Sequence, residues 1–392
     1  SSAESTITIE PHFGTDGQSS SSLLSQLSSW SSNHKLSGIC YLALKIKWNP
    51  DVFGGIPQVQ AKIKGKKVIT LASNLSEQTA SFSTNPAFCL LDYLRNERYG
   101  KGLATSEINL QSFYDASQIA VTQVPTFSGG SDINIFDCNA VIDTSKKVID
   151  NVREIVKGMR GYLPFVQGQY RLNIETIGSA SVSLDEDDII GGYALASPSK
   201  NSKYNRVLVQ FVNPDRNFQV DEIQFPPIDD SSLPSADQHA TMKTEDGGFL
   251  LEGRFDFRTI TSPYQAEEMA EIILRRSRQA LGLNLNVGFE AYDLHVGDLV
   301  NISLTSLGFS NKTFRVLAMT FNDDFTVGLS LIEYQASHYT WATKTQVATT
   351  PSTNLPNPFT IQPPASLTLS DEMIEYADGV VLTRLNILIG RS

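Results

Sequence analysis

Cysteine is scarce in this sequence, and its few occurrences are not grouped. Among 392 residues there are three, Cys40, Cys89 and Cys138. An odd number without C-x-x-C spacing provides neither a disulfide framework nor a zinc site. We therefore expect three unpaired thiols that pack as small buried hydrophobes, in a fold held together by its apolar core.

Basic charge and long apolar runs are also lacking. The chain has 31 Lys and Arg against 42 Asp and Glu, a net charge of -11, which argues against general nucleic-acid binding because such binding needs a basic face. No segment approaches the ~18 uninterrupted apolar residues of a membrane span. The polar, serine-rich start does not have the pattern of a signal peptide. Because the sequence begins without methionine, we expect a fragment of a longer chain.

Catalytic motifs are missing as well. The sequence has no G-x-S-x-G, P-loop or G-x-G-x-x-G motif, so nucleophile-elbow, NTPase and dinucleotide-binding sites lack their first requirement. The histidines are scattered and none lies in an H-E-x-x-H motif: His12, His34, His239, His295 and His338. We expect no enzyme activity, no catalytic, cofactor-binding or metal-binding residues, and no cofactor.

The sharpest charge cluster is the acidic run Asp185–Asp188. Carboxylates in a row are hard oxygen ligands that suit calcium, but their spacing does not fit the D-x-D-x-D-G loop, and Ile189 follows directly. The preferred interpretation is an acidic first turn of a helix, stabilised by the helix dipole. Whether the run binds a cation stays open.

What the sequence does contain is an ordinary globular mixture, 41% hydrophobic and 19% charged, long enough for two to four domains. Most of it is strand-like with a few helical segments, which predicts an α+β, mostly β fold. The stretch "ICYLALKIKW" from Ile39 predicts a strand, and "PQVQAKIKGKKVI" predicts a hairpin with its turn at Gly65.

The stretch "NPAFCLLDYLRNERYGKGL" predicts a short helix over residues 85–96. Asn85 can cap its free N–H groups, Pro86 fits the first helical position, and Gly100 can take a left-handed stop. A second helix is expected near residues 105–117.

A third helix is expected to begin at Thr144 or Ser145, because an apolar stripe follows at helical spacing. After it, "GYLPFVQGQYRLNIE" predicts two strands around a Gln167-Gly168 turn.

The strongest helix signal covers residues 263–281. Ser262 as cap and Gln265 at the third position make a capping box, and Gly282 is expected to close the helix. Glutamates lie early and arginines late, as the helix dipole favours: Glu267, Glu268, Glu271, Arg275, Arg276 and Arg278.

A run of short strand patterns follows in residues 285–340: "LNVGFEAY", "LVNISL", "TFRVLAMTF" and "TVGLSLIEY". Several short strands in series predict a small barrel. The Pro-, Thr- and Asn-rich stretch beyond them is typical of a linker, and the final residues have the pattern of the opening strands of a β-sandwich.

The order of these motifs resembles the tail tip attachment proteins of long-tailed bacteriophages, the family of the lambda tail protein J. In that family a "G-x-P-x-x-x-A-x-x-x-G-x-x-V" segment precedes an "N-P-x-x-x-x-x-D-x-L" helix and a "Y-G-x-G" turn. These are matched here by Gly55, Pro57, Ala61, Gly65 and Val68, then by Asn85, Pro86, Asp92, Leu94, Tyr99, Gly100 and Gly102. "RGYLPFVQGQYRLNIE" and "LHVGDLVNISL" resemble later elements, so the resemblance covers residues 36 to 345.

The resemblance implies hub-type small β-barrel domains with an inserted helix-containing α+β domain, followed by the start of a fibronectin type III β-sandwich. The expected division is a first β-rich hub domain at 1–80, the α+β domain at 81–190, a second β-barrel hub domain with its helix at 191–346, a linker at 347–363, and the truncated fibronectin type III-like start at 364–392.

The resemblance also implies a function: a structural component of the phage tail tip, made in the host cytoplasm, that closes the tail tube as its central hub. It would carry host-receptor-binding modules and take part in host attachment and genome ejection. The implied partners are further copies in a homotrimer, the distal tail and other tail tip proteins, and the tape measure protein. Receptor contacts would be made only by C-terminal modules absent from this sequence, and DNA would pass through the channel without specific binding.

Two other functions stay open. A secreted or surface carbohydrate-binding, adhesin-like protein would also combine β domains with a fibronectin-like module, and exposed aromatic platforms would mark it. A tail-associated cell-wall hydrolase would need a paired-carboxylate or zinc site.

Overall fold

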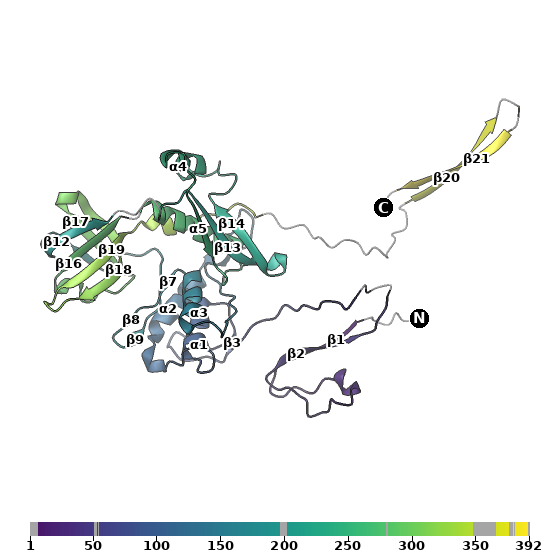
Figure 1. Cartoon of the computed structure of the whole chain (residues 1–392), viewed down its shortest axis with the longest axis horizontal. Helices are drawn as coiled ribbons and strands as arrows, with labels where there is room; N and C mark the ends of the chain where they lie inside the picture. Colours follow the sequence, from purple (N-terminus) through teal and green to yellow (C-terminus); the bar gives the residue numbers. More distant parts are fainter. Residues whose placement is uncertain are drawn as a thin grey trace. The chain divides into compact units, whose positions relative to one another are not determined.

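The computed structural model describes residues 7–50, 53, 55–196, 202–279, 281–347, 366–375, 379 and 381–390. Within these ranges, strands outnumber the five α-helices (Figure 1). The chain divides into two compact units, Lys64–Thr350 on the one hand and Ser1–Ile63 with Pro351–Ser392 on the other. The α+β, mostly β class predicted from the sequence is confirmed.

The smaller unit contains two antiparallel pairs of strands. Strand β1 (Ile7–Phe13) pairs with β2 (Cys40–Ile46), and β20 (Ser366–Glu375) pairs with β21 (Val381–Gly390). The strand predicted from Ile39 is therefore confirmed as β2. In the predicted first hub domain at 1–80, β1 and β2 form a two-stranded sheet, and a barrel that they would complete with later strands stays a prediction. The predicted linker at 347–363 lies outside the described residues, apart from residue 347.

The hairpin predicted around Gly65 is wrong. Strand β3 (Lys67–Val68) pairs antiparallel with β4 (Ser81–Phe82) instead. Val59 and Ile63, which alternate with polar residues in the sequence, are exposed. Because these side chains have no apolar face to cover, the alternating pattern does not lead to a strand here.

A helical core lies within residues 68–174. Helices α1 (Pro86–Arg95), α2 (Leu110–Ala120) and α3 (Val148–Gly158) form it, with α1 packed against both of the others. Short antiparallel pairs surround the helices: β5 (Gln123–Val124) with β6 (Ile133–Asn134), β7 (Gly161–Tyr162) with β10 (Asn173–Ile174), and β8 (Phe165–Val166) with β9 (Gln169–Tyr170).

Helix α1 begins as predicted, but its end differs. The Asn85 side chain accepts a hydrogen bond from the N–H of Ala87 at 3.1 Å, and Pro86 is the first helical residue. Gly100 does not take the left-handed conformation, which belongs to Gly102 with a φ of 70°. Position 100 requires glycine for a steric reason instead, because a Cβ there would lie 1.7 Å from the carbonyl oxygen of Tyr93.

The other two helices begin later than predicted. Helix α2 starts at Leu110, where the Asn109 side chain accepts from the N–H of Ser112 at 3.0 Å. Helix α3 starts at Val148, and Ser145 donates its hydroxyl to Asp143 at 2.6 Å rather than capping the helix. The tight turn between β8 and β9 is confirmed, since Gln167 and Gly168 both have positive φ.

A curled, six-stranded half-barrel forms a second core (Figure 1). Its spatial order is β11 (Val182–Leu184), β17 (Leu299–Leu304), β18 (Phe309–Phe321), β19 (Val327–Glu333), β16 (Gly282–Val287) and β12 (Ile189–Ala196). Alternate residues such as Leu283, Leu285 and Val287 fill its interior. Three of the predicted strands match β17, β18 and β19, while the fourth, predicted over residues 285–292, ends at Val287.

The acidic run forms the turn between β11 and β12, so the predicted helical turn is wrong. The Asp188 carboxylate accepts from the N–H of Asp185, and the Asp185 carboxylate accepts from the N–H of Asp187, both at 2.9 Å. The short acidic side chains therefore serve the backbone of a tight turn.

Between β12 and β16 the chain forms a third core. Its sheet has the order β14 (Gln219–Phe225), β13 (Arg206–Asn213) and β15 (Glu252–Asp256). Helix α5 (Pro263–Arg278) packs on β13 and β14 (Figure 1), and α4 (His239–Glu245) contributes Met242 to the same core. Residues 182–333 thus hold two cores, the half-barrel and this αβ layer.

Short 3-10 helices occur at Leu24–Gln26, Thr105–Glu107, Pro214–Arg216, Ser235–Asp237, Phe289–Ala291, Thr305–Leu307 and Ala336–Tyr339. Among the described residues, no helix has the length and apolar character needed to cross a membrane.

Candidate functional site

Helix α5 carries a row of polar side chains on its buried face. It starts as predicted after Ser262, whose hydroxyl accepts from the N–H of Gln265 at 3.5 Å. Gln265 does not complete a capping box: its amide donates to the carbonyl oxygen of Gly158 at 3.2 Å and accepts from the N–H of Asp137 at 3.4 Å. Gly282 does not close the helix either, because it opens strand β16.

The glutamates that were predicted to favour the helix dipole are buried: Glu267, Glu268 and Glu271. Lys344 pairs with two of them, with its Nζ 2.6 Å from Glu268 Oε2 and 2.5 Å from Glu271 Oε2. Burial alone would lower the pKa of Lys344, but the two carboxylates outweigh burial and the pKa is raised. The predicted Glu271–Arg275 ion pair is confirmed at 2.8 Å.

Lys344 belongs to the segment that follows the half-barrel in sequence and returns to the helical core. Its N–H donates to the carbonyl oxygen of Thr126 at 2.8 Å. Trp341 in the same segment donates its indole N–H to the carbonyl oxygen of Pro125 at 2.7 Å. The segment therefore links the loop after β5 to the carboxylates of α5.

Glu175 is the centre of a second group of buried charges. Only 2% of its surface is exposed. Its carboxylate accepts from the hydroxyl of Tyr339 at 2.6 Å and from the guanidinium of Arg276 at 2.8 Å, and Arg315 Nε lies 3.4 Å away. These partners come from the 3-10 helix after β19, from α5 and from β18, so one carboxylate joins all three cores.

Arg160 lies between the two groups. Its backbone is left-handed, with a φ of 52°, and its guanidinium stacks over the ring of Phe136, 4.9 Å from the centroid. Glu268 is 4.0 Å away. Burial lowers the pKa of Arg160 despite this carboxylate, as expected for a desolvated cation.

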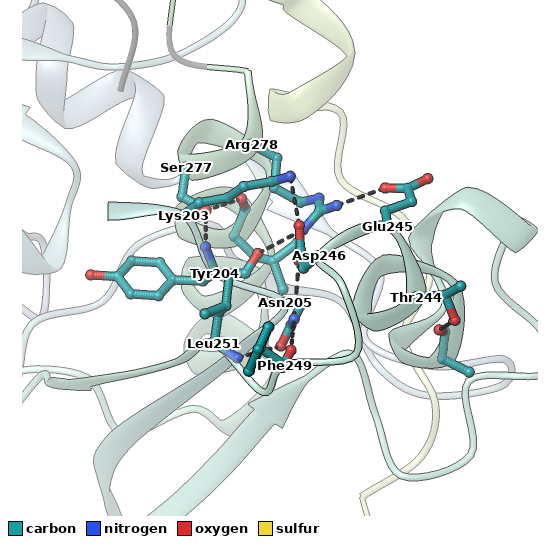
Figure 2. Close-up of polar contacts among 12 residues, drawn as sticks. Lys203, Tyr204, Asn205, Thr244, Glu245, Asp246, Phe249, Leu251, Ser277 and Arg278 are labelled. Atoms are coloured by element: carbon teal, nitrogen blue, oxygen red, sulfur yellow. Dashed lines mark hydrogen bonds and ion pairs between the residues drawn. The ribbon is translucent and has the colours of Figure 1, made fainter. Parts of the chain in front are cut away.

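A third polar cluster fixes the C-terminal end of α5 (Figure 2). The buried carboxylate of Asp246 accepts from Lys203 at 2.6 Å, from Arg278 at 2.8 Å and from the Asn205 amide at 3.0 Å. Burial would raise the pKa of Asp246, but these three donors lower it. Glu245 accepts a further bond from Arg278 at 2.7 Å, so the loop after α4, the start of β13 and the end of α5 are held together.

These clusters connect elements that are far apart in the sequence. The side chains of Glu268, Glu271 and Lys344 are buried, and Arg275 pairs with Glu271 in addition to the shared Lys344. Within the described ranges, no group of three or more His, Cys, Asp or Glu side chains could hold a metal ion. Of the histidines, His12 lies 3.2 Å from Glu10, His295 lies 3.6 Å from Asp298, and the others occupy separate elements.

The cysteines are all free thiols, but only Cys138 is buried as predicted. Cys89 is half-buried and Cys40 is exposed, which the sequence did not indicate. The Cys89 thiol donates to the carbonyl oxygen of Ser83 at 3.5 Å, and the nearby Cys89, together with burial, raises the pKa of Cys138.

Sequence reasoning missed the buried charges at Glu175, Arg315 and Lys344. One signal was available for Arg315, which stands in the middle of the apolar strand pattern "TFRVLAMTF". A charge at a core position of a strand is rare unless it is paired. Nothing in the neighbouring sequence identifies its partner, which lies 140 residues earlier in the chain.

The curated relatives of the chain include two phage proteins. The chain is 24% identical over 320 residues to baseplate hub protein pb3 of Escherichia phage T5, covering 78% of this chain and 32% of that protein. It is 26% identical over 184 residues to tip attachment protein J of Escherichia phage SECphi27, covering 42% of this chain and 15% of that protein. The chain thus spans about a third or less of the length of these relatives, and the resemblance to the tip attachment proteins is confirmed.

Among solved structures, the chain is similar to one in the virion of a native gene transfer agent particle. The match has a TM-score of 0.51 and 12% identity, and covers 87% of this chain and 74% of that chain. At this identity the likeness concerns the fold. No protein-family model matches the chain.

Proposed function

We propose that this chain is part of the central hub at the tail tip of a long-tailed bacteriophage, where it closes the tail tube and takes part in host attachment and genome ejection. The observation that carries the proposal is the similarity to a baseplate hub protein over 78% of the chain. The fold likeness to a chain of a gene transfer agent virion agrees with it. The protein would be made in the host cytoplasm and reside in the virion.

The buried ion pairs support a mechanical role rather than an enzymatic one. A hub that joins the tail to the host surface would need fixed contacts between its domains. Glu175, Lys344 and Asp246 each bind groups from elements far apart in sequence. Breaking such a buried pair costs about 3–5 kcal/mol, which makes separation of the cores expensive. We propose that the chain is not an enzyme.

We propose further that the hub is a homotrimer. Three chains with two similar domains each would present six similar surfaces to a sixfold tail tube. The described residues provide one curled sheet of this kind, the half-barrel. A second would require other strands to complete β1 and β2, since a two-stranded sheet is marginal on its own.

The remaining partners are proposed on the same basis. They are the distal tail and other tail tip proteins, and the tape measure protein. The β20–β21 hairpin would begin a fibronectin type III domain, and modules beyond it would bind the host receptor. With a net charge of -11 per chain, the walls of a central channel would repel DNA and let it pass without specific binding.

Immunogold labelling with an antibody against this chain tests the proposal on intact particles. Gold at the free end of the tail, opposite the head, is the expected result. Gold on the head, or no labelling of particles whose tail tip is intact and accessible to antibody, would count against the proposal.

One observation favours the carbohydrate-binding alternative. Aromatic rings are exposed at one end of the half-barrel, including Phe289, Tyr292 and Phe321, and such rings can stack on sugars. Binding of host oligosaccharides that is lost in Phe321→Ala, while the fold is unchanged, would support this alternative. The cell-wall hydrolase has no comparable observation in its favour.

A further inference from the structure

One end of the half-barrel presents a cluster of exposed aromatic side chains, which we call the aromatic tip: Phe289, Tyr292, Phe321 and Phe325. Phe289 and Tyr292 stack with ring centroids 5.0 Å apart, and Tyr292 lies 5.2 Å from Phe321. Phe325 is 89% exposed. Because large apolar side chains gathered on a surface mark an interaction site, the tip is a candidate for binding another protein.

The hairpin that carries Phe325 is held in a defined shape. The Asp324 carboxylate accepts from the N–H of Thr326 at 3.1 Å and from its hydroxyl at 2.7 Å. The Asn322 amide donates to the same hydroxyl at 2.9 Å. Phe325 itself has a φ of 62°, a conformation that costs energy for a bulky residue. The local bonds thus fix an exposed ring in an unfavourable backbone conformation.

The charged residues next to the aromatic tip in the sequence are acidic. Its exposed charged neighbours in sequence are Glu290, Asp293, Asp323 and Asp324. A surface that combines aromatic rings with carboxylates is complementary to an apolar surface with a basic rim.

The same chain has such a surface on helix α3. A groove of about 650 Å³ runs along the helix, and we call it the α3 groove. Its apolar lining includes Val148, Ile149, Val152, Val156 and Leu163. Ile149 is 49% exposed although it belongs to the apolar stripe of the helix. A volume of this size lies within the range of about 300–1,000 Å³ that takes a drug-sized ligand, so it has room for more than one aromatic side chain.

Every charged residue that lines the α3 groove is basic: Lys101, Arg153 and Lys157. Arg153 is 72% exposed and has a long contact of 3.5 Å with Asp150 on the same helix. Lys101 lies over the ring of Tyr170, 4.3 Å from its centroid, and contacts the Tyr170 hydroxyl. Since Lys157 also donates to the backbone of Asp256, Lys101 and Arg153 are the cations best placed to meet carboxylates of a partner.

We propose that the aromatic tip of one copy of this chain binds in the α3 groove of a second copy. Both surfaces belong to the described part of Lys64–Thr350, and no residue of the tip lines the groove of its own copy. The contact is heterologous, because two different patches meet, and repetition of such a contact produces a ring when the rotation closes. The inference rests on the proposed function only in that a hub contains several copies.

Cross-linking of two variants that each carry one introduced cysteine tests the contact. In a background in which the exposed Cys40 is replaced by serine, Phe325→Cys and Ile149→Cys are prepared separately, mixed, and oxidised with oxidised glutathione. A disulfide-linked dimer that contains one copy of each variant is expected. The matched control replaces Phe325→Cys by Ile228→Cys, which is 93% exposed and lies outside the tip. Equal yield in the control, or dimers formed only between two Phe325→Cys copies, would overturn the proposal.

A charge-reversal series tests the complementarity. Arg153→Glu, added to the Ile149→Cys variant that supplies the groove, should reduce the yield of the mixed dimer about tenfold, which corresponds to about 1.4 kcal/mol. Asp323→Lys, added to the Phe325→Cys variant that supplies the aromatic tip, should restore the yield. Circular dichroism of each variant confirms that the fold is retained. A yield that is insensitive to both changes contradicts the contact, whereas the location of the protein on the particle, tested by immunogold, does not depend on this result.

Discussion

Replacing Glu267 by glutamine should stabilise the protein at alkaline pH. Glu267 lies on the buried face of α5 and is 7% exposed. Its pKa is raised from 4.5 to about 7: burial is the main cause, Lys344 offsets part of it, and the neighbouring Glu271 and Glu268 add to it. The charged form is therefore disfavoured in the folded protein.

The magnitude follows from the difference between the folded and unfolded pKa. A carboxyl whose pKa is raised on folding contributes stability that is fully present below the unfolded pKa of 4.5 and is lost as pH rises through the folded pKa of about 7. At about 1.36 kcal/mol per pKa unit, the loss amounts to roughly 3 kcal/mol above pH 8. Glu267→Gln, which cannot ionise, escapes this loss.

Urea denaturation across a pH series measures the effect. The stability difference between Glu267→Gln and the parent should be near zero at pH 4 and should grow to about 3 kcal/mol in favour of the variant at pH 8.5. Glu97→Gln, at an exposed position, is the control for removal of a carboxylate. A loss of stability in Glu267→Gln of equal size at both pH values would refute the reasoning, because it would show that the carboxylate is needed by a cation.

Three further outcomes are expected. Lys344→Met should cost about 3–5 kcal/mol at pH 8, because it leaves the buried Glu268 and Glu271 without their shared cation; urea denaturation measures this, and a change below about 1 kcal/mol would contradict it. Ser262→Ala should cost on the order of 1 kcal/mol through the lost cap of α5, and a neutral result would mean that the cap bond is not formed. Thiol titration of the denatured, unreduced protein should find three reactive groups, and fewer would indicate a disulfide.

Much of the secondary structure could be predicted from the sequence because its causes are local. The alternation in "LVNISL" follows directly from one face of the half-barrel being buried. The start of α1 could be predicted because Asn85 and Pro86 act within one turn. These features depend on residues a few positions apart, which a sequence pattern reports.

The errors arose where a distant contact decided the outcome. Gln265 matched a capping box, but its side chain bonds to Gly158 and Asp137, more than a hundred residues away. The glutamates of α5 matched the helix dipole, but they are buried because Lys344 returns to them from beyond the half-barrel. The alternating segment before Gly65 has the pattern of a hairpin strand. It does not pair with Lys67–Val68, because that strand pairs with β4 instead.

The sequence predicted the type of protein but not the residues of the candidate site. The order of the motifs indicated the resemblance to phage tail tip proteins, which the curated relatives confirm. The buried charges that join the three cores could not be found in advance, because Glu175, Arg276 and Arg315 are each ordinary residues in their own segments. Their role depends on the tertiary fold that brings them together.

A reconstruction by electron microscopy of the phage particle that encodes this chain tests the central claim most directly. The account predicts density for the half-barrel and the αβ layer at the tip of the tail, with three copies around the axis and an acidic channel wall. Six copies at the tip or a basic channel wall would contradict the homotrimer, and a tail tip without this fold would contradict the hub itself.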